Sequence, residues 1–205
     1  MNFQGKNFIE HIAEVNRLLD NCEEKLKLGA YHSALRDANT ATFIERDYFQ
    51  SHYYRSLCMS ALGDFAEALK EINICLEQNP DFGDALVERG NLYQRCEDYD
   101  RCVLDYTKAI DLEEDNFSAY YNRGYVYLIC GKYEEAINDF SYIIKHKPFD
   151  ADALNNLGLA MYQKGQELEG IANLYKSAEL NPMSDAVENL KIIENDMIKK
   201  HRKRK

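Results

Sequence analysis

The six cysteines and five histidines are the residues of this sequence best suited to metal binding or nucleophilic chemistry. No Cys-x-x-Cys pair occurs, and the histidines form no pair at zinc-site spacing. The N-terminus lacks the basic-then-apolar pattern of a secretion signal, so we expect reduced thiols in a cytoplasmic protein. Cysteine is also a small apolar residue favoured in cores. The pattern favours buried structural thiols and predicts no metal and no cofactor.

The sequence contains none of the common catalytic motifs. It has no glycine-rich phosphate loop, no Gly-x-Ser-x-Gly turn, no His-Glu-x-x-His pattern and no calcium-binding loop. The acidic pairs Glu113-Glu114 and Glu134-Glu135 fall at expected helix ends or turns, where solvated carboxylates are common. We therefore predict that the chain is not an enzyme and that its function lies in binding.

The charge is divided unevenly along the chain. The formal net charge of −10 includes a C-terminal run, residues 199–205, with six positive charges and no negative one. Without that run, 19 basic residues face 35 acidic ones, a formal charge of −16. A body this acidic repels nucleic-acid phosphates and anionic lipid, so only the tail could attract them. No apolar stretch approaches the ~20 residues that cross a bilayer, and we expect no membrane partner.

Glycine and proline recur at an interval of 34 residues. Gly90, Gly124 and Gly158 are 34 residues apart, and the three prolines share one frame. The chain can be written without insertions as five blocks, which are 15–48, 49–82, 83–116, 117–150 and 151–184. Periods of this length are typical of stacked supersecondary units. Positions within each block are numbered from 1 to 34.

The recurring positions have physical roles. Small residues at positions 8 and 20 let two helices approach closely, where a bulky residue would introduce strain of ~1–3 kcal/mol. Glycine or another turn residue at position 15 separates the helices. Proline at position 32 ends the second helix because it has no N–H to donate. Each block is therefore expected to form an antiparallel helix pair that buries its apolar face by stacking on its neighbour.

This pattern resembles the tetratricopeptide repeat (TPR) over residues 15–184. The resemblance implies an all-α fold, a right-handed superhelical α-solenoid of five 34-residue helix-turn-helix repeats plus a C-terminal capping helix. The departures include Cys22 at position 8, Glu97 at position 15 and Glu167 at the usually aromatic position 17. The middle three blocks fit best, and terminal repeats of solenoids are commonly atypical.

The flanks of the repeats have amphipathic patterns of their own. We expect a repeat domain over 1–184, a capping helix over 185–198 and a basic tail over 199–205. Ser184 is the expected start of the last helix, whose apolar face is predicted to cover the final repeat; docking to a partner is the alternative. That face is formed by Ala186, Leu190, Ile193 and Met197. The spacing of Phe8, Ile9, Ile12 and Val15 lengthens the first helix.

The resemblance also implies a concave groove, lined by the first helix of each pair, that holds a peptide. Tyrosine suits such a surface because it has a rigid apolar body and a polar tip, and asparagine can pair with peptide groups. Packing between adjacent first helices is the alternative role of the tyrosines. The predicted groove residues are Tyr53, Leu57, Val87, Asn91, Tyr121, Asn122, Tyr125, Asn155, Asn156 and Tyr162.

The sequence therefore predicts a non-enzymatic protein-interaction scaffold that binds a peptide or protein segment in this groove. The alternatives are an assembly subunit or chaperone-like adaptor of a larger complex, and a nucleic-acid contact through the basic tail. Arg55, Arg89 and Arg123 recur at position 7 and are interpreted as bridges to neighbouring acids. Some members of the family hold a carboxylate tail with lysine and arginine, but Val87 and Asp152 stand at two of those cationic positions. We expect no appreciable affinity for such tails.

Overall fold

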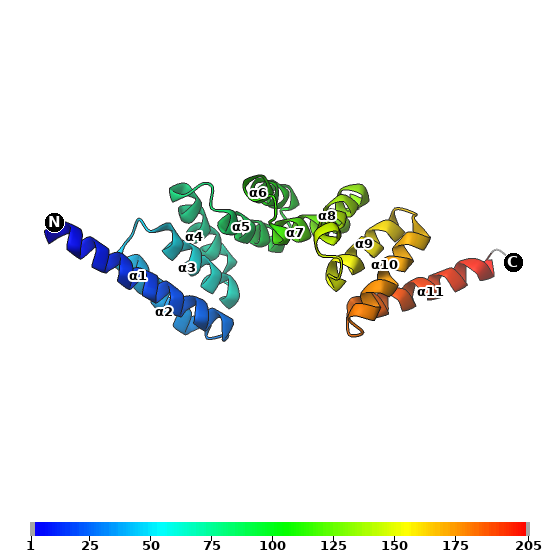
Figure 1. Ribbon diagram of the computed structural model, residues 1–205, viewed down its shortest axis with the longest axis horizontal. Helices are drawn as coiled ribbons and strands as arrows, with labels where there is room; N and C mark the ends of the chain where they lie inside the picture. Colours follow the sequence, from blue (N-terminus) through cyan, green and yellow to red (C-terminus); the bar gives the residue numbers. More distant parts are fainter. Residues whose placement is uncertain (1–2, 204–205) are drawn as a thin grey trace. The chain divides into compact units, whose positions relative to one another are not determined.

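The chain, described here from a computed structural model, forms α-helices joined by short turns (Figure 1). The structure describes residues 3–203, and their side chains within residues 10–199. This part of the chain contains eleven helices and no strand. The helices are α1 (Phe3–Lys27), α2 (Tyr31–Ile44), α3 (Phe49–Leu62), α4 (Phe65–Gln78), α5 (Gly83–Arg95), α6 (Tyr99–Leu112), α7 (Phe117–Ile129), α8 (Tyr133–His146), α9 (Ala151–Gln163), α10 (Glu167–Leu180) and α11 (Asp185–Lys203).

The helices belong to two compact units, residues 1–114 with α1–α6 and residues 115–205 with α7–α11. Helices joined by a short turn, such as α3 with α4 and α9 with α10, pack against each other and therefore run antiparallel. Within the first unit α2 packs on α3 and α4 on α5, and within the second α8 packs on α9. Stacking of pairs within each unit confirms the predicted all-α helical-repeat fold.

The turn between the two helices of each pair has the same backbone conformation in all five repeats. Position 15 has a positive φ at Gly29 (73°), Gly63 (85°), Gly131 (73°) and Gly165 (95°). Glu97 occupies this position in the third repeat and has a φ of 58°. A side chain is strained in this left-handed region, where glycine is not. The departure from glycine therefore leaves the turn geometry of the third repeat unchanged.

Position 8 is where the two helices of a pair come closest. A Cβ on Gly90 would lie 2.5 Å from Cε1 of Tyr106, whose side chain is fully buried. A Cβ on Gly158 would lie 2.7 Å from the backbone oxygen of Gly170 at position 20. Side chains cannot be accommodated at such distances without moving a helix or a core ring. The predicted requirement for small residues therefore has a direct steric cause.

The cysteines divide into a buried and an exposed group. Cys22 and Cys58 are fully buried, with their Sγ atoms 3.6 Å apart between α1 and α3, and Cys75 and Cys102 are buried as well. Cys96 and Cys130 are exposed, so the expectation of buried thiols was wrong for these two. Both lie at the C-terminal ends of helices, directly after α5 and α7, where the chain turns through solvent.

Helix α11 packs on α10 and α9. Ala186, Leu190 and Ile193 are buried against Leu174, whereas Met197 is exposed, so the apolar contact ends one turn earlier than its spacing suggests. Ser184 Oγ is buried without a hydrogen-bond partner, and the expected side-chain cap is not formed. The side chains of Phe8, Ile9 and residues 200–205 lie outside the described part of the chain.

None of the helices described within residues 3–203 is long and apolar enough to span a bilayer. Among the side chains that the structure describes, no three His, Cys, Asp or Glu residues are placed to hold a metal ion.

The close approach at position 8 can be tested with two glycines of α5. Gly90→Ala should lower the free energy of unfolding by ~1–3 kcal/mol, because the new methyl group overlaps the buried ring of Tyr106. Gly83→Ala is the matched control, since the nearest atom, Glu113 Oε1, would lie 3.5 Å from its Cβ. Urea unfolding followed by circular dichroism measures both. Equal stability of the two variants would contradict the steric argument.

Candidate functional site

The arginines at position 7 form buried ion pairs inside the repeats. Arg89 donates from Nε and Nη2 to the Asp105 carboxylate at 2.8 and 2.7 Å. Arg123 binds Asp139 in the same way, at 2.9 and 2.7 Å. In the second repeat, Arg55 Nη1 lies 3.0 Å from Glu71 Oε2. Each pair joins the two helices of one repeat, so the interpretation of these arginines as bridges to neighbouring acids is confirmed.

The acidic partners of these arginines were not predicted from the sequence, although they recur at one position of the repeat. Glu71, Asp105 and Asp139 all stand at position 23, and Asp37 occupies the same position in the first repeat. In that repeat, position 7 holds no arginine, and Asp37 instead pairs with Lys25. The 34-residue spacing of these acids, read together with that of the arginines, would have identified the pairs.

Burial changes the titration of the Asp139 carboxylate. Its pKa is raised because the group is removed from water, and the hydrogen bonds from Arg123 act in the opposite direction. Asp139 is therefore a buried acid that needs its arginine to remain charged. These pairs join the two helices of a repeat, and Arg55 Nε remains buried without a hydrogen-bond partner.

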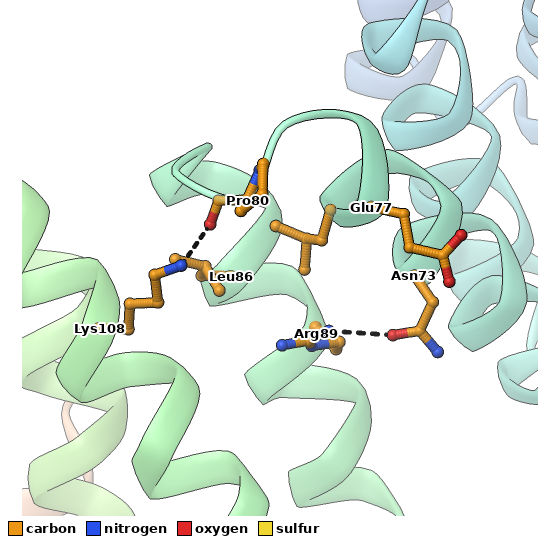
Figure 2. Close-up of a pocket in the computed structure, with 7 residues that line it drawn as sticks. Asn73, Glu77, Pro80, Leu86, Arg89 and Lys108 are labelled. Carbon is orange, nitrogen blue, oxygen red and sulfur yellow. Dashed lines mark hydrogen bonds between the residues drawn. The ribbon is translucent and has the colours of Figure 1, made fainter. Parts of the chain in front are cut away.

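Two hollows of the first unit recur at equivalent repeat positions. The α2–α3 hollow, of about 330 Å³, is lined by Asn39, Thr42, Phe43, Arg46, His52 and Arg55. The α4–α5 hollow, of about 260 Å³, is lined by Asn73, Leu76, Glu77, Pro80, Leu86, Arg89 and Lys108 (Figure 2). Both use positions 25, 28, 29 and 32 of one repeat and positions 4 and 7 of the next.

The cations of the α4–α5 hollow are engaged within the protein. Figure 2 shows Arg89 donating to Asn73 Oδ1, at 3.0 Å, and Lys108 donating to the backbone oxygen of Pro80, at 2.6 Å. Lys108 also pairs with Asp81 at 3.1 Å. This hollow therefore has few unsatisfied groups for a ligand.

A third hollow lies where the first helices of successive pairs meet. This α1–α3 hollow, of about 260 Å³, is lined by Asn16, Leu19, Asp20, Gln50, Tyr53, Tyr54, Phe82 and Asp84. These residues come from α1, α3 and the start of α5, all within the first unit. Most occupy positions 2, 5 and 6. Positions 5 and 6 follow position 2 by three and four residues, so their side chains lie on the same side of a helix as that of position 2.

Aromatic rings form the apolar wall of the α1–α3 hollow. Tyr53 packs edge to face against Phe82, with 5.0 Å between ring centroids, and against Tyr54, at 5.4 Å. Burial raises the pKa of Tyr53, and the charges of Asp84 and Glu88 raise it further. The pKa of Tyr54 rises to about 12, mainly through burial and the nearby charge of Glu23. Both phenols are therefore neutral at physiological pH, and both lie in a negative field.

Several acceptors of this hollow have no partner within the described side chains. The carboxylates of Asp20 and Asp84 form no ion pair and no side-chain hydrogen bond there. Gln50 Oε1 is buried and accepts no hydrogen bond. No basic residue lines the hollow. The α1–α3 hollow can therefore receive hydrogen-bond donors and positive charge.

The predicted groove residues of the first unit have different environments. Tyr53 packs against Phe82 and also lines the α1–α3 hollow, and its role in binding stays a prediction. Leu57 and Val87 are half-buried. Asn91 is held by its own repeat, since its Oδ1 accepts from Tyr106 Oη at 2.7 Å. Of these four residues, only Tyr53 lines the hollow.

In the second unit, several predicted groove residues bind one another. Asn156 Nδ2 donates to Tyr121 Oη at 2.9 Å, and Tyr121 packs edge to face on the buried ring of Phe140. Asn155 Oδ1 accepts from Asn189 of α11 at 2.9 Å. Both asparagines are buried, at 7% and 6% exposure.

The other three predicted residues of the second unit range from packed to exposed. Tyr162 packs against the apolar face of α11. Asn122 is half-buried, and Tyr125 is exposed at 40%. Of the residues predicted in this unit, Tyr125 is therefore the one whose ring is most accessible.

Sequence comparison finds the same repeat in known protein families. Tetratricopeptide repeat models match residues 83–116 and 105–138, and a TPR repeat model matches residues 124–165. Protein PHOX1 of Arabidopsis thaliana is 30% identical over 114 residues, which are 51% of this chain. The match covers 15% of that relative, so the chain spans a small part of its length.

Structure comparison finds similar folds at low identity. YrrB, described as a TPR protein with an unusual peptide-binding site, has a TM-score of 0.71 at 17% identity, covering 93% of this chain and 98% of its own. MamA from Desulfovibrio magneticus RS-1 has a TM-score of 0.73 at 18% identity, covering 84% and 97%. A tetratricopeptide repeat protein from Parabacteroides merdae has a TM-score of 0.71 at 21% identity, covering 92% and 74%. At these identities the likeness concerns the fold alone.

The Arg123–Asp139 pair generates a pH-dependent prediction. Arg123→Leu should lower the free energy of unfolding by ~3–5 kcal/mol at neutral pH, because Asp139 is left buried and unpaired. Without the arginine, the already raised pKa of Asp139 rises further. The loss should shrink as the pH falls through that raised pKa, because the protonated acid needs no cation.

Urea unfolding at pH 7.5 and pH 5 measures this effect. Arg101→Leu is the control, since Arg101 pairs with Asp98 on the surface and its removal should lower stability much less than Arg123→Leu does. A loss for Arg123→Leu that is the same at both pH values would show that the carboxylate does not control it.

Proposed function

We propose that this chain, which belongs to the tetratricopeptide repeat family, is a protein-interaction scaffold that binds a peptide or protein segment at the α1–α3 hollow. The observation that carries this proposal is the hollow itself, which combines an aromatic wall with unpartnered polar groups. Tyr53 supplies rigid apolar area, and Asp20, Asp84 and Gln50 supply acceptors. Such a surface suits recognition because aromatic anchors beside a few polar groups dominate binding energy.

The first unit supports this proposal better than the second. The asparagines at positions 5 and 6 of the last repeat are buried and hydrogen-bonded, one of them to α11. A ligand there would have to displace bonds that the protein already makes. In the α1–α3 hollow, Asp20 at position 6 and Asp84 at position 2 form no ion pair and no side-chain hydrogen bond within the described side chains, so a ligand donor can reach them without displacing such a bond.

The chemistry of the hollow favours binding over catalysis. Its lining consists of amides, carboxylates and rings, without a nucleophile next to a base. A peptide backbone supplies amide donors, and Asp20 and Asp84 supply exposed carboxylate acceptors. The related structure of YrrB is described as having an unusual peptide-binding site, which is a further reason to consider a peptide here. A cytoplasmic setting, with reduced cysteines, is part of the proposal.

A chaperone-adaptor role that depends on an acidic tail is disfavoured by the same lining. The hollow has two carboxylates and no cation, so a bound carboxylate would gain no charge-assisted hydrogen bond and would be repelled.

Blocking the hollow with an uncharged ring tests the proposal. A randomised 12-residue peptide display library would be selected against the wild-type chain, and the enriched peptides measured by fluorescence anisotropy. Asn16→Trp should weaken their binding at least tenfold, because the indole occupies the hollow that Asn16 lines. This loss corresponds to ~1.4 kcal/mol or more.

Asn39→Trp is the matched control, since Asn39 is an exposed asparagine that lines the α2–α3 hollow of the same unit. Its binding should stay within twofold of wild type. Equal loss in both variants, or loss only in Asn39→Trp, would rule out the α1–α3 hollow as the binding site. Circular dichroism of both variants checks that the helices remain folded.

A further inference from the structure

The charged side chains that line the α1–α3 hollow are all negative. Asp20 and Asp84 provide two carboxylates without an ion pair, and Gln50 Oε1 provides a buried acceptor without a donor. Two buried carboxylates of the same unit are instead paired, Asp105 with Arg89 and Glu71 with Arg55. An acceptor that is buried without a donor costs free energy until one arrives. The lining is therefore complementary to a group that is rich in donors and positively charged.

The negative character continues along α5. Glu88 lies one turn after Asp84 on the same face, and its Oε1 is buried without a hydrogen-bond partner. Burial raises the pKa of Glu88, although Ser60 and Asn91 donate to the carboxylate and oppose the rise. The charges of Asp84 and Glu88 both act on Tyr53. Glu88 therefore adds to the negative field beside the hollow.

The aromatic wall suits a cation with an apolar stem. Tyr53, Tyr54 and Phe82 surround the hollow, and a guanidinium or ammonium group is attracted to the face of such rings. The methylene stems of lysine and arginine also pack well on apolar surface while the charged end reaches a polar partner. An aliphatic side chain would pack on the rings but would bring no positive charge. An acidic side chain would be repelled by the carboxylates of the hollow.

The size of the hollow points to side chains of a polypeptide. Its volume of about 260 Å³ is below the roughly 300–1,000 Å³ of sites that enclose a small molecule. Asp20 and Asp84 are exposed and lie on different helices, so a chain can cross the opening while inserting one side chain.

We propose that the α1–α3 hollow recognises a lysine- or arginine-rich segment of a separate partner protein, with one basic side chain inserted between the carboxylates and the aromatic wall. This inference rests on the proposed function and names the class of ligand. The acidic body of the chain, at −16 without its tail, favours approach of a basic segment over the whole surface. Acidic segments and nucleic-acid backbones are excluded from the hollow by the same charge.

The test uses a fluorescein-labelled peptide, Gly-Arg-Ala-Lys-Ala-Arg-Ala-Lys-Gly, titrated with the full chain in an anisotropy assay. A second probe carries glutamine at every basic position. We expect micromolar binding of the basic probe and at least tenfold weaker binding of the glutamine probe. Asp20→Asn with Asp84→Asn should weaken the basic probe at least tenfold, because both charge partners are lost.

Asp100→Asn with Asp111→Asn is the matched control. Both residues are exposed on α6 of the same unit, outside the hollow, and Asp100 lies in a first helical turn as Asp84 does. The control should bind the basic probe within twofold of wild type. Equal loss in both double variants would show general attraction to an acidic body and would overturn the proposal. Equal binding of the glutamine and basic probes would overturn it too.

The display selection separates this inference from the proposed function. Enriched peptides that lose binding in Asn16→Trp but contain no excess of lysine or arginine would leave the peptide site in place and overturn its basic specificity. If no enriched peptide responds to Asn16→Trp, the proposed function itself fails.

A second copy of the chain is the competing occupant, because residues 199–205 are themselves basic. Sedimentation velocity of the full chain decides between the two. A monomer across micromolar concentrations supports a separate partner. Self-association that disappears in Asp20→Asn with Asp84→Asn would place the tail of another copy in the hollow and overturn the assignment.

Discussion

The close approach of two helices within each repeat is the constraint on which the rest of the structure depends. At Gly90 and Gly158 the neighbouring helix leaves no room for a Cβ, so the pair can pack only at one depth and register. The turn conformation at position 15 sets the reversal between the helices. With both fixed, each first helix must present the same positions to its neighbours. The α1–α3 hollow is a consequence, since positions 2, 5 and 6 of successive repeats are brought together there.

The fold could be predicted from the sequence because its determinants are local and periodic. Glycine spacing predicted the turns and the close approach, and even Glu97 adopts the left-handed conformation of the glycines that it replaces. The chemistry of the site was harder to predict because it depends on which polar groups find partners. Asn155 and Asn91 belong to equivalent surfaces in sequence, yet Asn189 binds one and Tyr106 the other. Gln50 lacked any pattern that would single it out, and only the packing around it reveals its unpartnered oxygen.

Charge is organised differently inside the repeats and at the hollow. Arg89 and Arg123 lie beside acids on the second helix of their own repeat, where burial makes a partner necessary. These pairs tie the helices together and are removed from any competition for ligands. Asp20 and Asp84 instead lie at the surface of the first helices, where solvent can keep a carboxylate charged without a partner. The same residue type therefore contributes to the fold in one place and remains available for binding in the other.

Helix α11 explains why the two units differ in their binding potential. Asn189 lies 34 residues after Asn155 and bonds to it, so α11 stands in the register of the first helix of a further repeat. Its buried residues cover Leu174 and contact Tyr162, which in an uncapped repeat would be left to solvent. Covering that apolar surface stabilises the last repeat and at the same time satisfies a groove-position asparagine. The groove positions that remain unsatisfied are thus those of the first unit, where the α1–α3 hollow combines rings with free carboxylates.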